Sequence, residues 1–482
     1  MSMNEPAVAQ RGNPLGYQPV GKLLLSFSVP SIISCLVNSI YNIVDQIFIG
    51  QGVGYLGNAA TTVAFPVMTI VMAFATLIGS GGSAYAAIKL GEKQDGEAKL
   101  TLNNLLTLSV VVGVGILALG LIFLEPLLSL FGATGAVMPY AKDYTSIILL
   151  GVPFSILGVS LSNMARTDGS PRLSMYGILI GAVLNTILDP IYIFTLGWGV
   201  KGAALATITS QIISAVILLL YFWKRGHMRF DRQAMKPVGR VVGKTVALGA
   251  SAGITQVVAC IMQVVMNNSL VHYGNLSDVG GEVALSAMGI VMKIAMILGS
   301  VCIGIGVGAQ PILGFNYGAQ HNVRIRRTYR MAVIWATVAI LAGWVFCQTC
   351  PNLILQLFGG GSDTFNAFAV RCMRIFLGGI FCAGFQIVST NYFQATGQPL
   401  KASILSMLRQ LLLLIPLLLI LPLFFGLDGV LYAGPAADIG SAVIVFLFVV
   451  PEMKKLDRRI KLEQKKEFVA ETQVQELAEQ NR

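Results

Sequence analysis

The sequence predicts an all-α integral membrane protein whose twelve transmembrane helices form two lobes of six. The composition indicates this class, since 55% of the residues are hydrophobic and 11% are charged, against about 25% charged in a soluble domain. Apolar runs of about 20 residues, the length needed to cross a bilayer, recur along the whole chain. The chain also repeats itself: NMARTDGSP at Asn163–Pro171 returns as NYFQATGQP at Asn391–Pro399, at an offset of about 227 residues.

The apolar runs define the elements in order. The first six cover residues 24–50, 58–88, 101–124, 140–163, 173–195 and 202–223, and the second six cover 245–272, 283–314, 331–349, 365–392, 402–424 and 430–450. We therefore expect a first lobe over residues 23–223, a linker over 224–244 and a second lobe over 245–451. Residues 1–22 are a polar segment in which no removable signal peptide is evident. Residues 452–482 form a charged tail, expected either to make a short amphipathic helix or to stay solvated.

Basic residues predict the orientation, because cytoplasmic loops collect Lys and Arg. Most of the 33 Lys and Arg fall in the connections after even-numbered spans, Arg409 among them, in the linker and in the tail, whereas the odd-numbered connections hold only Lys201. Both termini should therefore be cytoplasmic, in a multi-pass protein of the cytoplasmic membrane. Loop anchoring accounts for the formal net charge of +11, so no nucleic-acid partner is predicted.

Three motifs that suggest soluble chemistry do not hold. Gly239–Thr245 reads G-x-x-x-G-K-T, one residue short of a phosphate-binding loop, and no strand precedes it. Gly249–Gly253 matches G-x-S-x-G but lies in an apolar helix, where small residues more often serve helix packing. Cys347 and Cys350 lack the two further ligands of a zinc site. We therefore expect no enzyme, no cofactor and no metal other than a coupling ion.

Two acidic residues lie inside apolar spans, where a carboxylate indicates a functional site. Asn42 is one helical turn from Asp45, Asn185 is one turn from Asp189, and Thr207 lies at a similar depth, roughly 8 to 9 Å below the outer boundary. Carboxylate, amide and hydroxyl oxygens suit a hard cation such as Na⁺, and they equally suit a network that shares a proton. The alternative is a set of polar residues that only holds helices together.

Neither aspartate returns in the second lobe, where the repeat places Asp189 near Ile415 and Asp45, after a small gap, near Asn267 or Asn268. That lobe instead carries Lys293 in the eighth span and Asp438 in the twelfth, at matching depths. An unpaired charge at such depth is costly, so we expect these two residues to form an ion pair. The pair is either structural or part of a substrate path.

Four segments together resemble the multidrug and toxic compound extrusion (MATE) family of prokaryotic type, over roughly residues 22 to 452. They are PSIISCLVNSIYNIVDQIFIG (Pro30–Gly50), RTDGSP (Arg166–Pro171), NTILDPIYIF (Asn185–Phe194) and GAALAT (Gly202–Thr207). The resemblance implies a V-shaped pair of lobes and an inner-membrane antiporter, expected as a monomer among membrane lipids, that admits H⁺ or Na⁺ and exports cationic, amphipathic organic compounds. The family's amino-terminal cation site then falls on Asp45, Asn185, Asp189 and Thr207.

A cation-coupled efflux transporter is thus the favoured function. The alternative is a flippase for lipid-linked oligosaccharides or peptidoglycan precursors, from a related branch of the same superfamily. Such a flippase would need several cations in its central cavity to hold a pyrophosphate, and inside the spans we find chiefly Lys293. A membrane-embedded transferase is disfavoured by the lack of an aspartate-rich diphosphate motif. The sequence leaves open which compounds are exported and which ion drives export.

Overall fold

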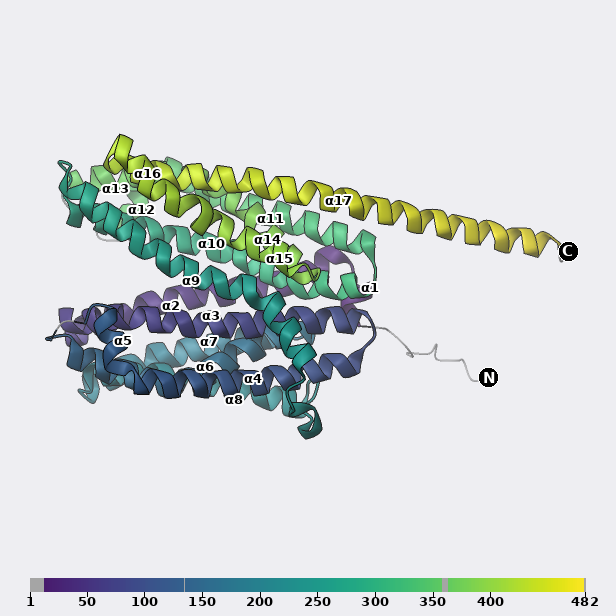
Figure 1. Ribbon diagram of the computed structural model, residues 1–482, viewed down its shortest axis with the longest axis horizontal. Coiled ribbons are helices and arrows are strands. Elements are labelled where there is room, and N and C mark those ends of the chain that lie inside the picture. Colours follow the sequence, from purple (N-terminus) through teal and green to yellow (C-terminus); the bar gives the residue numbers. More distant parts are fainter. Residues whose placement is uncertain (1–12, 134, 358–362, 481–482) are drawn as a thin grey trace, which may run out of the picture.

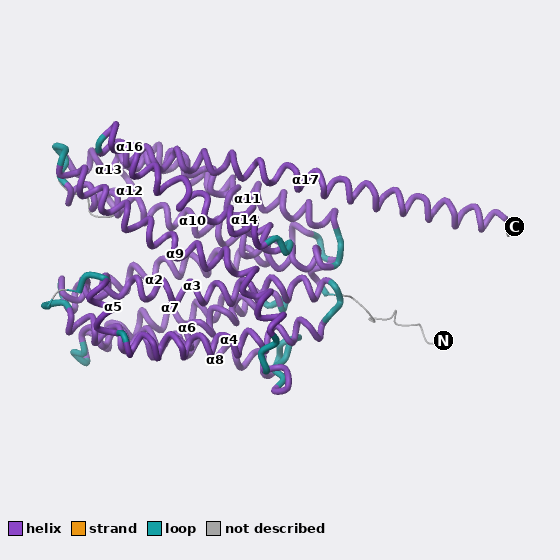
Figure 2. Tube along the Cα trace, in the orientation of Figure 1, coloured by secondary structure: helices purple, strands orange, loops and turns teal. Residues whose placement is uncertain are grey.

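The computed structural model describes residues 13–133, 135–357 and 363–480, and the elements of regular structure in them are helices (Figures 1 and 2). Twelve helical segments are long and apolar enough to cross a membrane, which confirms the predicted fold class. They extend beyond the apolar runs by several residues; the first covers Val20–Val53 where the hydropathy predicted 24–50. The helix ends therefore project past the hydrocarbon layer, which needs only about 20 residues.

The first lobe, here the N-lobe, contains six long helices and two short elements. They are α2 (Val20–Val53), α3 (Tyr55–Gly91), α4 (Asp95–Ile122), α5 (Leu124–Leu130), α6 (Met138–Thr167), α7 (Pro171–Pro190), the π-helix η1 (Ile191–Thr195) and α8 (Gly199–Lys224).

The second lobe, here the C-lobe, follows the linker Arg225–Val238, which contains the 3₁₀ turn η2 (Arg232–Met235). Its elements are α9 (Gly239–Asn275), α10 (Gly281–Gly318), α11 (Asn322–Thr349), α12 (Pro351–Leu357), α13 (Asp363–Phe376), the 3₁₀ turn η3 (Leu377–Cys382), α14 (Ala383–Ala395), α15 (Pro399–Met407), the π-helix η4 (Leu408–Leu414), α16 (Ile415–Phe425) and α17 (Leu427–Gln480). The charged tail does not form a separate short helix, because α17 continues into it without a break (Figure 1). Residues 1–12, 481 and 482 of the two predicted end segments lie outside the described residues.

Helix α2 is shared between the lobes. Its first turns place Leu23, Leu24 and Phe27 in the hydrophobic core of the C-lobe. Near its other end, Ile49 packs in an N-lobe cluster that includes Tyr144. The predicted division at residue 23 is therefore too simple, since half of this helix is buried against the second lobe.

The short helix α1 (Pro14–Tyr17) lies against the C-lobe rather than forming a free polar segment. Leu15 is only 1% exposed and belongs to the C-lobe core. Its carbonyl oxygen accepts hydrogen bonds from Arg324 and from Asn316, each at 3.1 Å, and Arg324 also donates to the carbonyl of Gln18 at 2.7 Å. The chain therefore enters α2 from a fixed position beside α10 and α11.

The linker is bonded to the N-lobe, and we call the end of the molecule that carries it the linker end. Asp168, in the turn after α6, accepts hydrogen bonds from the Tyr221 hydroxyl at 2.7 Å and from the amides of His227 and Met228 at 3.0 and 2.9 Å. Burial raises the pKa of Asp168 above its ordinary value, although these hydrogen bonds oppose the rise. Further along, Asn104 accepts from the amide of Val238 at 2.6 Å.

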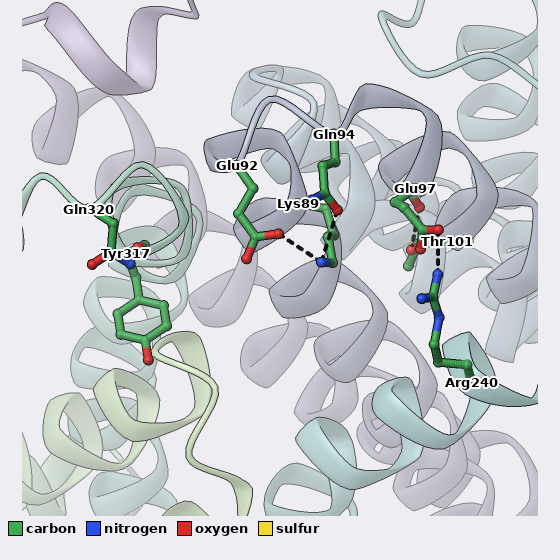
Figure 3. Close-up of polar contacts among 8 residues, drawn as sticks. All are labelled: Lys89, Glu92, Gln94, Glu97, Thr101, Arg240, Tyr317 and Gln320. Carbon is green, nitrogen blue, oxygen red and sulfur yellow. Dashed lines mark hydrogen bonds and ion pairs between the residues drawn. The ribbon is translucent and has the colours of Figure 1, made fainter.

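An ion pair continues this attachment into α9. Arg240, in the first turn of α9, pairs with Glu97 of α4, and nearby Lys89 donates to Glu92 and Gln94 across the turn between α3 and α4 (Figure 3). The linker thus follows the N-lobe closely, and the first turn of α9 is held there as well.

The lobes approach each other most closely where glycines replace side chains. A Cβ added to Gly249 of α9 would lie 1.8 Å from the carbonyl oxygen of Leu77 in α3, and one added to Gly81 would lie 2.0 Å from that of Thr245. Hydrogen bonds accompany this packing, since Gln394 of α14 donates to the Ser80 hydroxyl of α3 at 2.8 Å. The small residues of the discarded G-x-S-x-G match therefore serve close packing of α9 on α3.

Candidate functional site

The two intramembrane aspartates meet in the N-lobe. Asp45 of α2 and Asp189 of α7 have their carboxyl groups within hydrogen-bonding reach of each other. The Asn185 amide donates to Asp189 Oδ1 and to Thr207 Oγ1, both at 3.3 Å. Asp189 is 0% exposed, and Asn185 and Thr207 are also buried. Asp45 is half-buried, so side chains from α2, α7 and α8 form one largely buried polar group, which we call the carboxylate site.

Local sequence explains how α7 presents its part of this site. Asn185 and Asp189 are four residues apart, so their side chains lie on the same helix face. Pro190 follows directly, lacks a backbone donor and ends the regular helix, after which the chain continues as a π-helix over Ile191–Thr195. Such irregular turns are common at functional sites, because they loosen the backbone beside a reactive side chain.

Three oxygens of the carboxylate site have no hydrogen-bond donor among the described residues. They are Asp45 Oδ1, Asp189 Oδ2 and Asn185 Oδ1, and all three are buried. Buried polar atoms are normally paired, so a convergent set of unpaired acceptors indicates a place for a cation or a proton. Two ionised carboxylates in contact also repel each other, and a proton or a cation between them relieves that repulsion.

Two tyrosines that the sequence analysis did not identify border the site. Tyr41 of α2 and Tyr144 of α6 both interact electrostatically with Asp45 and Asp189. Tyr41 precedes Asp45 by four residues and could have been found from helical spacing. Tyr144 comes from a different helix, and no spacing in the chain relates it to either aspartate. An apolar cluster that includes Ile148, Ile193 and Ala203 packs around Tyr144.

Asn42 is not joined to the carboxylate site by any described contact. Its side chain is exposed, and its amide donates to the backbone carbonyl of Asn38 at 2.6 Å. The sequence placed it near Asp45 because the two residues are one turn apart, but the rotation between them turns Asn42 toward the surface of α2.

The predicted ion pair between Lys293 and Asp438 is wrong. Asp438 is 1% exposed and accepts a hydrogen bond from the guanidinium of Arg409. The side-chain amide of Gln386 also bonds to this turn of α17: it donates to the backbone carbonyl of Asp438 and to the Ser441 hydroxyl, each at 2.6 Å. Lys293 is exposed and forms no ion pair or hydrogen bond with the described residues.

The error arose from the placement of Arg409. We counted it among the basic residues of a cytoplasmic connection, whereas it lies inside the span Pro399–Phe425, on the π-helix η4. A buried carboxylate pairs with the cation that packing brings within reach, and α15 to α17 bring Arg409 rather than Lys293. The equal depths of Lys293 and Asp438 carried no information about which helices are neighbours.

Within the described residues there are two lobes of six helices able to span a membrane, and the carboxylate site lies in the first of them; this arrangement is that of a secondary transporter with internal repeats. The family model described as MatE matches residues 30–191 and 247–420, one block in each lobe. The chain therefore belongs to the MATE family of transporters.

Known proteins agree with this assignment along nearly the whole chain. The multidrug export protein MepA of Staphylococcus haemolyticus (strain JCSC1435) is 28% identical over 433 residues, which cover 89% of this chain and 93% of that protein. The MATE multidrug transporter DinF-BH, whose structure was solved as a complex, is 34% identical, has a TM-score of 0.84 and matches over 92% of this chain and 98% of its own. A multidrug resistance MATE family transporter in an outward-facing conformation has a TM-score of 0.87 at 23% identity, over 93% and 99% of the two chains.

Proposed function

We propose that this protein is a multidrug efflux antiporter that exports cationic, amphipathic organic compounds across the cytoplasmic membrane. The inward gradient of H⁺ or Na⁺ drives export, and the carboxylate site of Asp45, Asp189, Asn185 and Thr207 binds the coupling ion. The adjacent pair of carboxylates carries this proposal, because it is the one place in the described N-lobe where convergent buried oxygens lack donors. The multidrug transporters among the relatives support the substrate class.

The physical basis of coupling is the charge of the carboxylate site. With no bound cation, two adjacent carboxylates repel each other and draw water toward the site. A proton or Na⁺ cancels that repulsion and allows α2, α7 and α8 to pack tightly. The irregular backbone after Asp189 gives α7 a point at which it can bend between these two arrangements. Occupancy of the site thereby favours one conformation over the other by differential binding, which is what an antiporter requires.

The orientation belongs to the same proposal. The excess of Lys and Arg places the linker end in the cytoplasm, together with both termini. The carboxylate site then lies in the outer half of the N-lobe, since Asp45 is about 12 Å from the far end of α2. We further propose that the protein acts as a monomer, with H⁺ or Na⁺ as its only coupling ligand.

The test is transport by purified protein in liposomes with separately imposed proton and sodium gradients. We expect the wild type to transport ethidium under at least one gradient, and Asp45→Asn and Asp189→Asn each to abolish gradient-driven transport. An amide preserves side-chain volume and is cheaper to bury than a charge, so both variants should still insert and fold. Asp143→Asn is the matched control, because the Asp143 side chain is 47% exposed and pairs with Lys201 outside the site. Asn268→Ala, at the repeat position of Asp45, should also retain transport.

Two results would contradict the proposal. Full activity in both Asp→Asn variants, or an equally deep loss in Asn268→Ala, would show that coupling does not reside in the N-lobe. If ethidium accumulation in cells does not depend on the protein while turnover of a lipid-linked precursor does, the flippase is the better function.

A further inference from the structure

Helices α2 and α10 meet face to face between the lobes. The Ser39 and Ser300 hydroxyl oxygens are 2.8 Å apart. One turn nearer the linker end, a Cβ on Gly304 would lie 2.5 Å from the Cα of Ile32, so the two backbones almost touch. Ser300 and Gly304 therefore define the face that α10 turns toward the N-lobe.

Lys293 lies on the continuation of this face toward the far end. It precedes Ser300 by seven residues, which at 3.6 residues per turn places it only about 20° away around the helix axis. Here the side chains are no longer buried: Lys293 is exposed, Met296 is 46% exposed, and a Cβ on Gly289 would meet nothing within 4 Å.

The opposing face of α2 shows the same change. Gln46 follows Ser39 by seven residues, on nearly the same side of the helix, and it is exposed whereas Ser39 is buried. Beyond the contact between Ser39 and Ser300 the two helices therefore separate. Lys293 projects from the C-lobe on the surface that faces α2, and we call this the interlobe surface.

The ammonium group of Lys293 has an unusual position. Lys293 is about 18 Å along α10 from Gly281, well inside the span Gly281–Gly318. A lysine at this depth is costly unless it is hydrated or paired. The described residues offer it no ion pair, because Asp438 is taken by Arg409 and Asp189 is enclosed in the N-lobe.

We propose that Lys293 recognises an acidic group on the transported molecule, so that the protein prefers zwitterionic amphipaths to the corresponding permanent cations. This inference rests on the proposed efflux function and specifies its substrate class. The lysine ammonium donates up to three hydrogen bonds, and its bonds to a carboxylate are roughly twice as strong as neutral ones. Met296, one turn away, offers an adaptable apolar contact for the ring system of the same molecule.

The experiment compares two dyes that differ only in this acidic group. One is a xanthene dye with a free carboxylate, which is zwitterionic at neutral pH, and the other is its methyl ester, which is a permanent cation. Equilibrium binding to purified protein in nanodiscs is measured by fluorescence anisotropy with no gradient imposed. We expect the wild type to bind the acid more tightly than the ester, and Lys293→Met to weaken binding of the acid by about tenfold or more.

Controls separate recognition from general damage. Lys293→Met should leave ester binding unchanged or tighter, because a repulsive charge is removed. Lys293→Arg should keep the preference for the acid, since it keeps the charge. Lys201→Met is the matched control, because Lys201 is a 56% exposed lysine that pairs with Asp143 in the N-lobe. It should change binding of neither dye.

Several outcomes would overturn the inference. If the wild type binds the acid and the ester equally, or if Lys293→Met weakens the binding of both dyes equally, then Lys293 does not recognise a carboxylate. A loss confined to discs of anionic lipid would assign Lys293 to a lipid headgroup instead. The comparison of the two dyes is made without a gradient, so it does not depend on ion coupling. If gradient-driven ethidium transport is lost, the proposed function is contradicted, but the measured preference between the two dyes is unaffected.

Discussion

Replacing Arg409 by Met should destabilise the C-lobe strongly, because it removes the partner of a buried carboxylate. Asp438 is 1% exposed, and its carboxylate accepts from Arg409, while Gln386 is already committed to the Asp438 backbone carbonyl. Removing one partner of a buried ion pair typically costs about 3–5 kcal/mol.

The reverse change should cost less. Asp438→Asn leaves the Arg409 guanidinium, whose side chain is 30% exposed and can reach polar surroundings, so we expect a loss of about 1–3 kcal/mol. The double variant Arg409→Met, Asp438→Asn should be more stable than Arg409→Met alone, because no charge stays buried. Asn is the appropriate replacement, because it removes the charge of Asp438 while keeping the side-chain volume.

Thermal unfolding of the purified variants, followed by fluorescence-detected size exclusion in one detergent, measures these differences. Arg371→Met is the matched control: it breaks the pair with Asp428, whose two side chains are 53% and 30% exposed, and should cost less than about 1 kcal/mol. If Arg409→Met is no less stable than Arg371→Met, or if the double variant loses the sum of the two single losses, the buried pair does not have the energetic role assigned to it.

Three further predictions concern packing, topology and pH. Gly249→Ala should lower the free energy of unfolding by about 1–3 kcal/mol, because the added Cβ would lie 1.8 Å from the Leu77 carbonyl oxygen. Gly243→Ala on the same helix is the control: its Cβ would meet nothing within 4 Å, so the variant should be neutral or slightly stabilising in the same unfolding assay. Single cysteines that replace Gly54, Gly135 or Ser277 in a cysteine-free background should react with an impermeant thiol reagent added outside intact cells. A cysteine that replaces Gln233 should not react, and its labelling would show that the orientation is the reverse of the predicted one. Burial raises the pKa of Asp168 above 3.8, so the folded protein binds the proton of the Asp168 carboxyl group more tightly than the unfolded chain does. The contribution of Asp168 to stability should therefore fall as the pH rises from 3.8 to the pKa of the folded state, and stay constant above that pKa. Asp168→Asn should flatten this part of the plot of unfolding against pH.

Features that depend on local composition could be predicted from the amino-acid sequence. The twelve spans were predictable because bilayer thickness sets the length of each apolar run. Asp189 and Asn185 were predictable as a pair because helical geometry alone places residues four apart on one face. The two intramembrane aspartates stood out for a similar reason, since each charge interrupts an otherwise apolar segment. The structure brings these residues together with Thr207, while their role in coupling stays a prediction.

Which helices are neighbours could not be predicted from the sequence, because side chains far apart in the chain meet through packing that no local pattern encodes. The sequence pattern predicts Arg409 to be a loop anchor, whereas the packing of α15 to α17 brings it to Asp438. Tyr144 borders the carboxylate site although no spacing relates it to Asp45. Helix α2 divides its buried face between the two lobes, and Lys293 on the interlobe surface has no ion-pair or hydrogen-bond partner among the described residues. Each of these contacts depends on the relative positions of whole helices, which are set by the summed packing of both lobes.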